Sequence, residues 1–428
     1  MTAFSSALYA ALRRRLAALC CAVIAGCATQ SEPPPAAKMP QARESAPIEP
    51  LPPAPGAQAP VEEAAPSPGV VVQPVPLPPP APPRLSAAEG RMRVSRLLPP
   101  GVVDRAGWAT DIHAAFAALD LAQTADNFCA AIAITEQESG FRADPQVPGL
   151  PRLAWQEIEK QRSRTGIPKV VLWGALALPS PTGKSYSARL DAVKTERELS
   201  AIFEDFIGMV PLAKPFLANR NPVRTGGPMQ VSVAYAQAHA SARPYPYTVP
   251  TGIRHEVFKR RGGLYFGIAH LFDYAASYDA RIYRFADFNA GHYASRNAAF
   301  QHAVTQESGV PLALDGDLLR YENGRPVKAA GSTERAVRVL AKRLRMSHDE
   351  IRRDLERSRA ADFERSRLYF RLFVLADGVA RQRLPRAMLP RIRLQGPKIT
   401  RKLTTDWFAR RVDGRYRSCL ARAAALPY

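Results

Sequence analysis

The sequence predicts a mainly α-helical protein, and three observations carry that prediction. After Ser86, apolar residues recur at the spacing of amphipathic helices, and the alternation typical of strands is sparse. Two capping boxes, at 195–198 and 347–350, mark helix starts. Loops containing Gly and Pro separate the helical stretches. The folded part of the chain is therefore expected to be built from helices.

The helical spacing also gives approximate bounds for these elements. Besides the helices that follow the two capping boxes, nine further segments show apolar residues on one helical face. They are residues 108–119, 127–138, 230–239, 264–274, 282–288, 294–305, 335–344, 363–379 and 406–424.

The N-terminus has the pattern of a secretory signal. Three arginines at 13–15 precede a short apolar stretch at 16–24, followed by Ala25, Gly26 and Cys27. This stretch is too short to span a membrane, and residues 1–26 are expected to be a signal peptide. Small residues directly before Cys27 resemble the lipobox of bacterial lipoproteins, which implies a lipidated Cys27, and Ala28 implies sorting to the outer membrane. An ordinary signal peptide with an incidental cysteine is the alternative.

A proline-rich segment follows the signal, at residues 27–85. Nineteen of the 40 prolines lie between Pro33 and Arg84. Such a composition cannot build a core and favours an extended, disordered chain. Its limiting reach is about 160 Å at the rise of a polyproline helix. We expect a tether between a membrane anchor and a folded body, facing either the periplasm or the outside; a plain spacer is the alternative.

The charge of the chain is strongly basic. It has 59 Lys and Arg against 38 Asp and Glu, a net charge of +21, and +18 remains once the signal arginines are removed. For an exported protein, the expected partners are peptidoglycan or another envelope polyanion, with a lipid anchor in the membrane and no nucleic acid. A solvated basic surface without a specific partner is the alternative.

Three short motifs occur in order along the helical part. Glu-Ser-Gly-Phe at 138–141 closes one helix, Gly-Pro-Met-Gln at 227–230 opens another, and Ala-Asp-Phe-Asn-Ala-Gly at 286–291 closes a third. Together they resemble the goose-type lysozyme and lytic transglycosylase superfamily. The resemblance implies a lysozyme-like helical domain at 86–309 and a helical C-terminal extension at 310–428, packed on that domain.

The resemblance also implies a chemistry. A glycosidase needs a general acid in a partly apolar site, and Glu138 follows an apolar helix and precedes Phe141. In lytic transglycosylases one such Glu cleaves the glycan strand and leaves a 1,6-anhydro sugar, without metal or cofactor. By the same resemblance, the residues expected to form the sugar cleft are Ser139, Met229, Gln230, Phe288, Asn289 and Gly291.

This sequence departs from the superfamily pattern. Phe288 replaces the usual Tyr, and Pro228 replaces the usual Leu. The spacing of 92 residues from Glu138 to Gln230 requires an insertion at about 148–224. Two alternatives to catalysis therefore remain. Glu138 can be a solvated residue at a helix end, and the protein can bind glycan, peptide or a partner protein without cleaving it.

Other polar residues give weaker predictions. Asp144 is a candidate for ordering water, Glu136 is expected to be solvated, and Asp287 is expected to pair with Arg284. The histidines are scattered and lack the spacing of metal ligands. We therefore expect no metal site.

Two cysteines remain in the folded part, Cys129 and Cys419, because Cys20 and Cys21 leave with the signal and Cys27 is expected to be lipidated. In an oxidising compartment they would form one disulfide. Two buried free thiols are the alternative.

Longer blocks of sequence resemble the YaiW-type bacterial lipoproteins. That resemblance supports the outer-membrane lipoprotein prediction but implies no reaction, because the group is of unknown function. The blocks are residues 154–158, 221–230, 260–264, 283–291 and 397–401.

Overall fold

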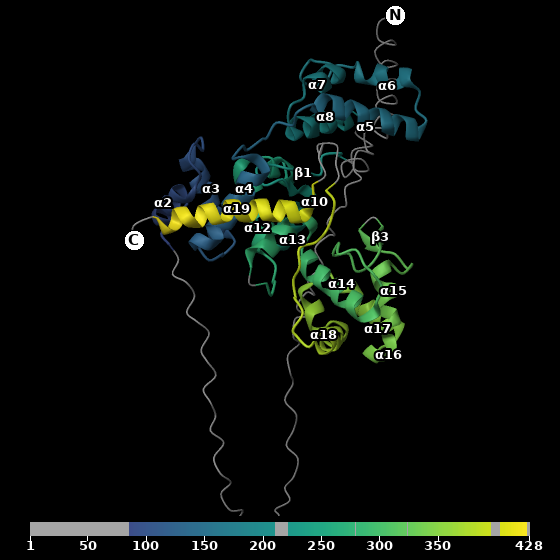
Figure 1. The fold of residues 1–428 in the computed structure, drawn as a ribbon. Helices are drawn as coiled ribbons and strands as arrows, with labels where there is room; N and C mark the ends of the chain where they lie inside the picture. The colour runs from purple at the N-terminus through teal and green to yellow at the C-terminus, as the bar shows by residue number, and fades with distance from the viewer. Residues whose placement is uncertain (1–84, 210–220, 279, 323, 395–402, 426–428) are drawn as a thin grey trace, which may run out of the picture. The chain divides into compact units, whose positions relative to one another are not determined.

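The computed structural model describes residues 85–209, 221–278, 280–322, 324–394 and 403–425. This part of the chain is mainly helical, as the sequence predicts (Figure 1). The signal segment, Cys27, nearly all of the Pro-rich segment and the block at 397–401 lie outside the described residues. Within them, no helix is long and apolar enough to cross a membrane.

The first hydrophobic core is built around helix α4 (Ala125–Ser139). Residues 128–134 of this helix are all buried. A helix that is apolar on every side must be covered on every side, so α4 lies inside the fold. The elements that supply the rest of this core are α2 (Ala87–Leu97), α3 (Arg105–Ala118), β2 (Val231–Ser232), α10 (Val233–Ala242), α11 (Ile253–Val257), α12 (Arg260–Phe272), α13 (Arg281–Ala290) and α19 (Thr405–Ala424).

The predicted insertion folds around a core of its own. Its helices pack through apolar side chains such as Phe203 and Phe206, which are almost fully buried. Thr195 caps the last helix with a complete capping box, as predicted. These helices, which lie together in Figure 1, are α5 (Leu150–Thr165), α6 (Lys169–Leu176), α7 (Tyr186–Ala192) and α8 (Glu196–Gly208).

A further hydrophobic core begins with α14 (Ala294–Ser308), whose Phe300 and Val304 pack in it with Phe363 and Leu372. The predicted helix at 335–344 is interrupted at Leu340, and the one at 363–379 restarts where Ser366 caps a new helix. The capping box at Ser347 is present. The elements after α14 are β3 (Tyr321–Glu322), β4 (Arg325–Pro326), α15 (Ser332–Val339), α16 (Ala341–Leu344), α17 (His348–Glu356), the 3₁₀ helix η2 (Ala361–Arg365) and α18 (Arg367–Ala380).

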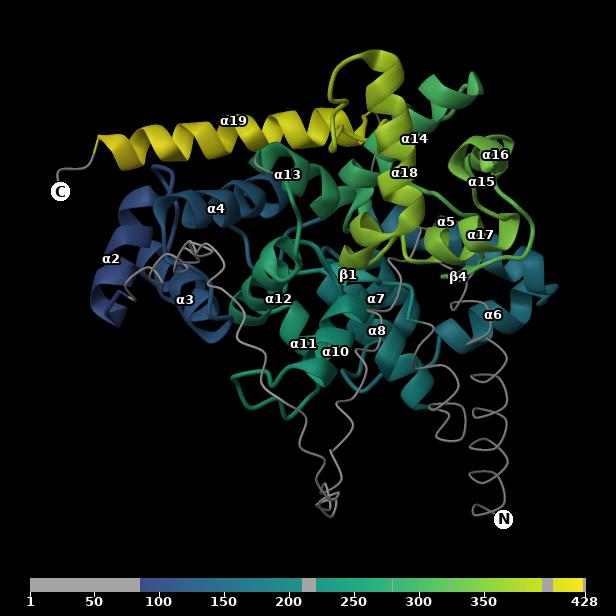
Figure 2. The same cartoon turned by 90° about the horizontal axis from the view of Figure 1, so that it is seen from below.

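The last helix, α19, does not belong to that further core. Its side chains Phe408, Val412 and Cys419 are buried in the first core. Figure 2 shows α19 lying along α4 and α13, with which it makes extensive contact. The predicted C-terminal extension is therefore divided between two cores, and its final helix completes the core that α4 begins.

A disulfide joins this last helix to α4. Cys129 and Cys419 are bonded, with 5.5 Å between their Cα atoms, across 290 residues of sequence. Two polar contacts add to it: Tyr416 donates to Asp126, and Arg415 lies 3.4 Å from the carboxylate of Glu136. Glu136, expected to be solvated, is thus a partner of α19.

We expect the Cys129→Ser/Cys419→Ser double variant to lose about 3–5 kcal/mol in the free energy of unfolding, because the bond closes a very long loop. Urea unfolding followed by circular dichroism measures this loss. A thiol reductant should lower the stability of the wild-type chain and leave the double variant unchanged. Equal stability of the two oxidised proteins would contradict the expectation.

Candidate functional site

The first motif forms the C-terminal end of α4. Glu138 is half-buried in the last turn, and Ser139 is buried. Gly140 ends the helix in the left-handed conformation with φ +59°, as its lack of a Cβ allows. Phe141 then packs edge-on against Trp108, with 5.2 Å between ring centroids. The helix end that was predicted to carry Glu138 is therefore well defined.

The hydroxyl group of Ser139 is used inside α4. It donates to the carbonyl of Thr135 at 3.0 Å. This is a common bond of serine within helices. Ser139 therefore contributes to the helix end itself, because its hydroxyl proton is used in a bond within α4.

The second motif is a tight turn and not the start of a helix. Residues 227–230 connect β1 (Thr225–Gly226) to β2, which pair as a short antiparallel hairpin, and α10 begins only at Val233. Gly227 has φ +74° and Gln230 has φ +49°. The Gln230 backbone N–H and its side-chain amide both donate to the carbonyl of Gly227, at 3.1 and 3.2 Å. Two left-handed residues reverse the chain where a helix was expected.

Close packing explains two residues of this turn. A Cβ at Gly227 would lie 2.0 Å from the carbonyl oxygen of Val257, so no larger residue fits. Met229 is fully buried and lies against Gly267 of α12. Met229, which was expected to line a sugar cleft, has its side chain in the first core.

The third motif ends α13. Phe288 is half-buried at the edge of the first core, and Asn289 is exposed. The side-chain oxygen of Asn289 accepts a hydrogen bond from Thr405 at the start of α19, at 3.1 Å. Gly291 turns the chain with φ +102°. Asn289 thus has a structural partner and remains accessible to a ligand.

Each of the three motifs has an apolar member that packs on the first core. Phe141, Met229 and Phe288 all pack on the first core. The polar side chains of Ser139, Gln230 and Asn289 each have a bond within or beside their own element. The three motifs therefore share the first hydrophobic core as their support.

Asp144 faces the inserted helices. Its carboxylate lies 2.9 Å from the guanidinium of Arg197 on α8. Burial raises the pKa of Asp144, and the charge of Arg197 opposes that shift. This residue therefore ties the chain after α4 to the insertion.

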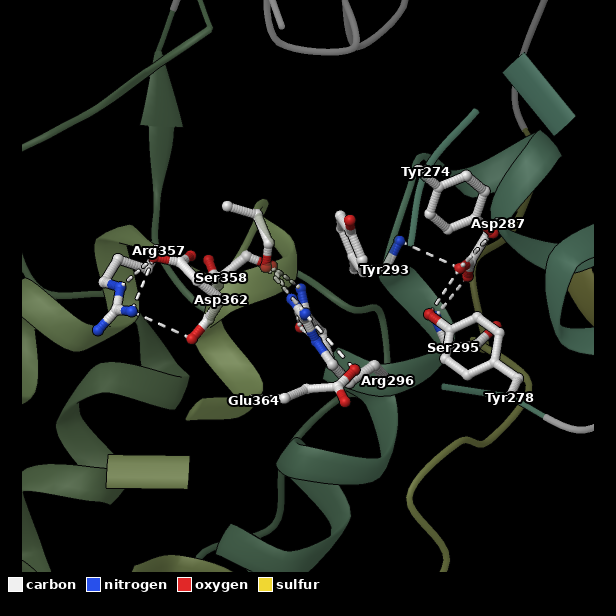
Figure 3. Close-up of polar contacts among 12 residues, drawn as sticks. Tyr274, Tyr278, Asp287, Tyr293, Ser295, Arg296, Arg357, Ser358, Asp362 and Glu364 are labelled. Atoms are coloured by element: carbon white, nitrogen blue, oxygen red, sulfur yellow. Dashed lines mark hydrogen bonds and ion pairs between the residues drawn. The ribbon is translucent and has the colours of Figure 1, made fainter. Parts of the chain in front are cut away.

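Asp287 was expected to pair with Arg284, and the structure gives it other partners (Figure 3). Its buried carboxylate accepts from the hydroxyls of Tyr274 and Tyr278 and from the backbone N–H groups of Tyr293 and Ser295, at 2.7–3.2 Å. The last two donors belong to the start of α14. Burial raises the pKa of Asp287 to about 6, against these four hydrogen bonds. Asp287 therefore joins the end of α13 to α14.

Arg296 continues this polar connection into the further core. Its side chain is fully buried and donates to the carbonyls of Ser358 and Ala360. Its guanidinium also lies over the rings of Tyr293, at 4.2 Å, and Phe363, at 5.1 Å. In Figure 3, Tyr293 stands between Asp287 and Arg296. The carboxylate and the guanidinium are thus held separately, one on each side of this ring.

A cluster of histidines was missed by the sequence reasoning. Three histidines described as scattered surround Tyr235 of α10, with ring centroids 4.7–6.0 Å from it. His270 and His292 stack at 4.4 Å, and His239 bonds the carboxylate of Asp273 at 3.0 Å. These side chains come from α10, from α12 and from the turn between α13 and α14, so no local motif could reveal them. Within the described residues, no group of His, Cys, Asp and Glu has the arrangement of a metal site.

This cluster touches the third motif. The ring of His270 bonds the carbonyl of Phe288 at 3.3 Å, and His292 donates to the carbonyl of His270 at 2.8 Å. Burial lowers the pKa of His270 well below its ordinary value and lowers that of His292 to about 4. At neutral pH both rings are neutral and support the end of α13.

The cluster makes stability depend on pH. Between pH 6.5 and 4 the unfolded chain binds a proton at His292 that the folded chain does not, which lowers the free energy of unfolding by up to about 3 kcal/mol. Asp287 acts in the opposite direction between pH 6 and 3.8, because its raised pKa lets the folded chain bind a proton first. Replacing His292 should therefore reduce the loss in the free energy of unfolding between pH 6.5 and 4.

We expect His292→Gln to be less stable than wild type at pH 8, because it loses the stack, but to lose less stability from pH 6.5 to 4. Urea unfolding at several pH values measures both effects. His255→Gln is the matched control, since His255 is 44% exposed and lies outside the cluster. The same acid loss in His292→Gln and wild type would refute the assignment.

Comparisons with known proteins place the chain in a family. The family model described as "Protein of unknown function (DUF1615)" matches residues 101–422, and the chain belongs to this family. It is similar to "Uncharacterized protein YaiW" of Escherichia coli (strain K12), with 53% identity over 327 residues, 76% of this chain and 88% of the relative. The predicted YaiW-type membership is confirmed. No solved structure matches the chain.

Proposed function

We propose that the protein is a lipid-anchored protein of the bacterial outer membrane and that its first core carries a glycan-cleaving site with Glu138 as the acid. The observation that carries the proposal is the placement of the three motifs. The ends of α4 and α13 and the β1–β2 turn pack on one core through Phe141, Phe288 and Met229. A substrate site assembled from separate chain segments requires such a common support.

Glu138 is the residue on which the chemistry depends. It is half-buried at a helix end, beside the apolar residue Phe141. A carboxyl group in a partly apolar site is the residue type that serves as a general acid near neutral pH. Its proton passes to the glycosidic oxygen as the bond from that oxygen to C1 breaks, while the acetamido group of the sugar stabilises the cation. The carboxylate then takes the C6 hydroxyl proton, and O6 bonds to C1.

This mechanism consumes no water and leaves a 1,6-anhydro end on the cleaved strand. We expect the unlipidated chain from Ala28 onward to release such ends from purified sacculi. Glu138→Gln should reduce the release at least 100-fold, because it removes the proton that is transferred. Mass spectrometry of the separated muropeptides measures the products.

Glu136→Gln is the matched control for this experiment. Glu136 lies two residues away on α4 and pairs with Arg415, so its replacement should leave the products unchanged. Reducing ends in place of anhydro ends would mean hydrolysis. Full activity of Glu138→Gln would overturn the role given to Glu138.

A second function on the same surface is glycan binding without cleavage. Phe288 favours it, since it lacks the hydroxyl that the superfamily Tyr supplies, and it lies half-buried beside His270. Binding of sacculi by both wild type and Glu138→Gln, with no products from either, would favour this function.

The anchor is tested separately in cells. We expect Cys27→Ala to abolish labelling by radioactive palmitate and to release the protein from the outer-membrane fraction, because Cys27 is the proposed acylation site. Cys21→Ala is the matched control, as Cys21 lies in the segment proposed to be removed. Palmitate labelling that persists in Cys27→Ala would contradict the proposed anchor.

A further inference from the structure

The inserted helices carry a pair of stacked tryptophans at the protein surface. Trp155 of α5 and Trp173 of α6 have ring centroids 5.0 Å apart and ring planes 17° apart. Trp173 is 46% exposed, whereas Trp155 is half-buried against the core of the insertion. One face of Trp173 therefore rests on Trp155, and a large part of the indole meets solvent.

The stack is held in a fixed orientation. The indole N–H of Trp155 donates to the carboxylate of Asp191 on α7 at 2.8 Å, so three helices define the position of the pair. This hydrogen bond fixes the ring of Trp155, and the ring of Trp155 supports the ring of Trp173. Rigid aromatic side chains lose little conformational freedom when a ligand binds, which favours affinity.

The surroundings of Trp173 on α6 are open and include exposed apolar surface. Val170, one turn earlier on α6, is 78% exposed. One residue after Trp173, a Cβ at Gly174 would meet nothing within 4 Å. Exposed apolar surface of this kind on a rigid support marks binding sites more often than isolated surface residues do.

We propose that the Trp155–Trp173 stack is a glycan-binding platform of the inserted helices, on which a neutral N-acetylated sugar ring of the peptidoglycan strand lies. The sugar class rests on the proposed function. The C–H face of a pyranose buries apolar area against the open indole. The exposed carboxylate of Asp191 lies beside the stack and can accept hydrogen bonds from sugar hydroxyl or amide groups.

An exposed apolar helix face with a tryptophan also suits a membrane interface. Charges of both signs accompany the stack, since Asp191 bonds Trp155 and the exposed Lys169 lies four residues before Trp173 on α6. The carboxylate of Asp191 favours a polyol, because it can accept hydrogen bonds from several hydroxyl or amide groups. The proposed task of the inserted helices is therefore to bind the glycan strand.

The test uses the unlipidated chain from Ala28 onward and the N-acetylglucosamine tetramer as the probe. The chain has four tryptophans, so ¹⁵N-tryptophan labelling gives four indole signals. The tetramer should shift the signals of Trp155 and Trp173 and leave that of the buried Trp108 in place. Trp173→Ala assigns its own signal and should weaken binding at least tenfold in calorimetry, while Trp173→Phe should restore part of it.

Val339→Ala is the matched control, since it removes an exposed apolar group from α15, outside the inserted helices. The indole signals report binding and not cleavage, so binding that requires Trp173 would support the platform even if no glycan cleavage occurs. Unshifted stack signals, or equal affinity of Trp173→Ala and wild type, would overturn the proposal. So would binding to phosphatidylcholine–phosphatidylglycerol vesicles that depends on Trp173, in the absence of tetramer binding.

Discussion

The fold depends on the covering of α4 by α19. Residues 128–134 are buried on every side, so this helix exposes apolar surface to water unless another element lies over it. That element comes from the far end of the chain, and the Cys129–Cys419 bond fixes it there. The first core is therefore complete only when the last helix has returned. Because α4 carries Glu138 and α19 holds Asn289 through Thr405, the same closure supports two of the three motifs.

Two buried charges connect the first core to the further one. A buried carboxylate or guanidinium is costly unless hydrogen bonds replace its hydration. Asp287 receives four donors, two of them from the start of α14, and Arg296 of α14 donates to carbonyls of a distant loop. Each charge therefore keeps all of its hydrogen bonds only while the end of α13 and the chain from α14 onward are both in place. These bonds link the chain after α14 to the end of α13.

The sequence predicted the helices well and the polar contacts poorly. Periodicity and capping boxes located α4, α8, α17 and α19, because those signals are local. The Cys129–Cys419 pairing followed from having only two cysteines in the folded part. The hairpin at 227–230 was missed, since its cause is a left-handed turn pressed against Val257. The histidine cluster and the Trp155–Trp173 stack depend on helices that meet only in the fold, and no spacing reveals them.

Structural roles account for several members of the motifs. Gly227 is required by close backbone approach and Met229 by the core, and Ser139 bonds within its own helix. A protein that kept the scaffold without any chemistry would keep these residues for their structural roles. Glu138 is half-buried at the end of α4, a position compatible with a general acid. The proposed catalysis therefore depends on Glu138, because it is the motif member to which the mechanism assigns the proton transfer.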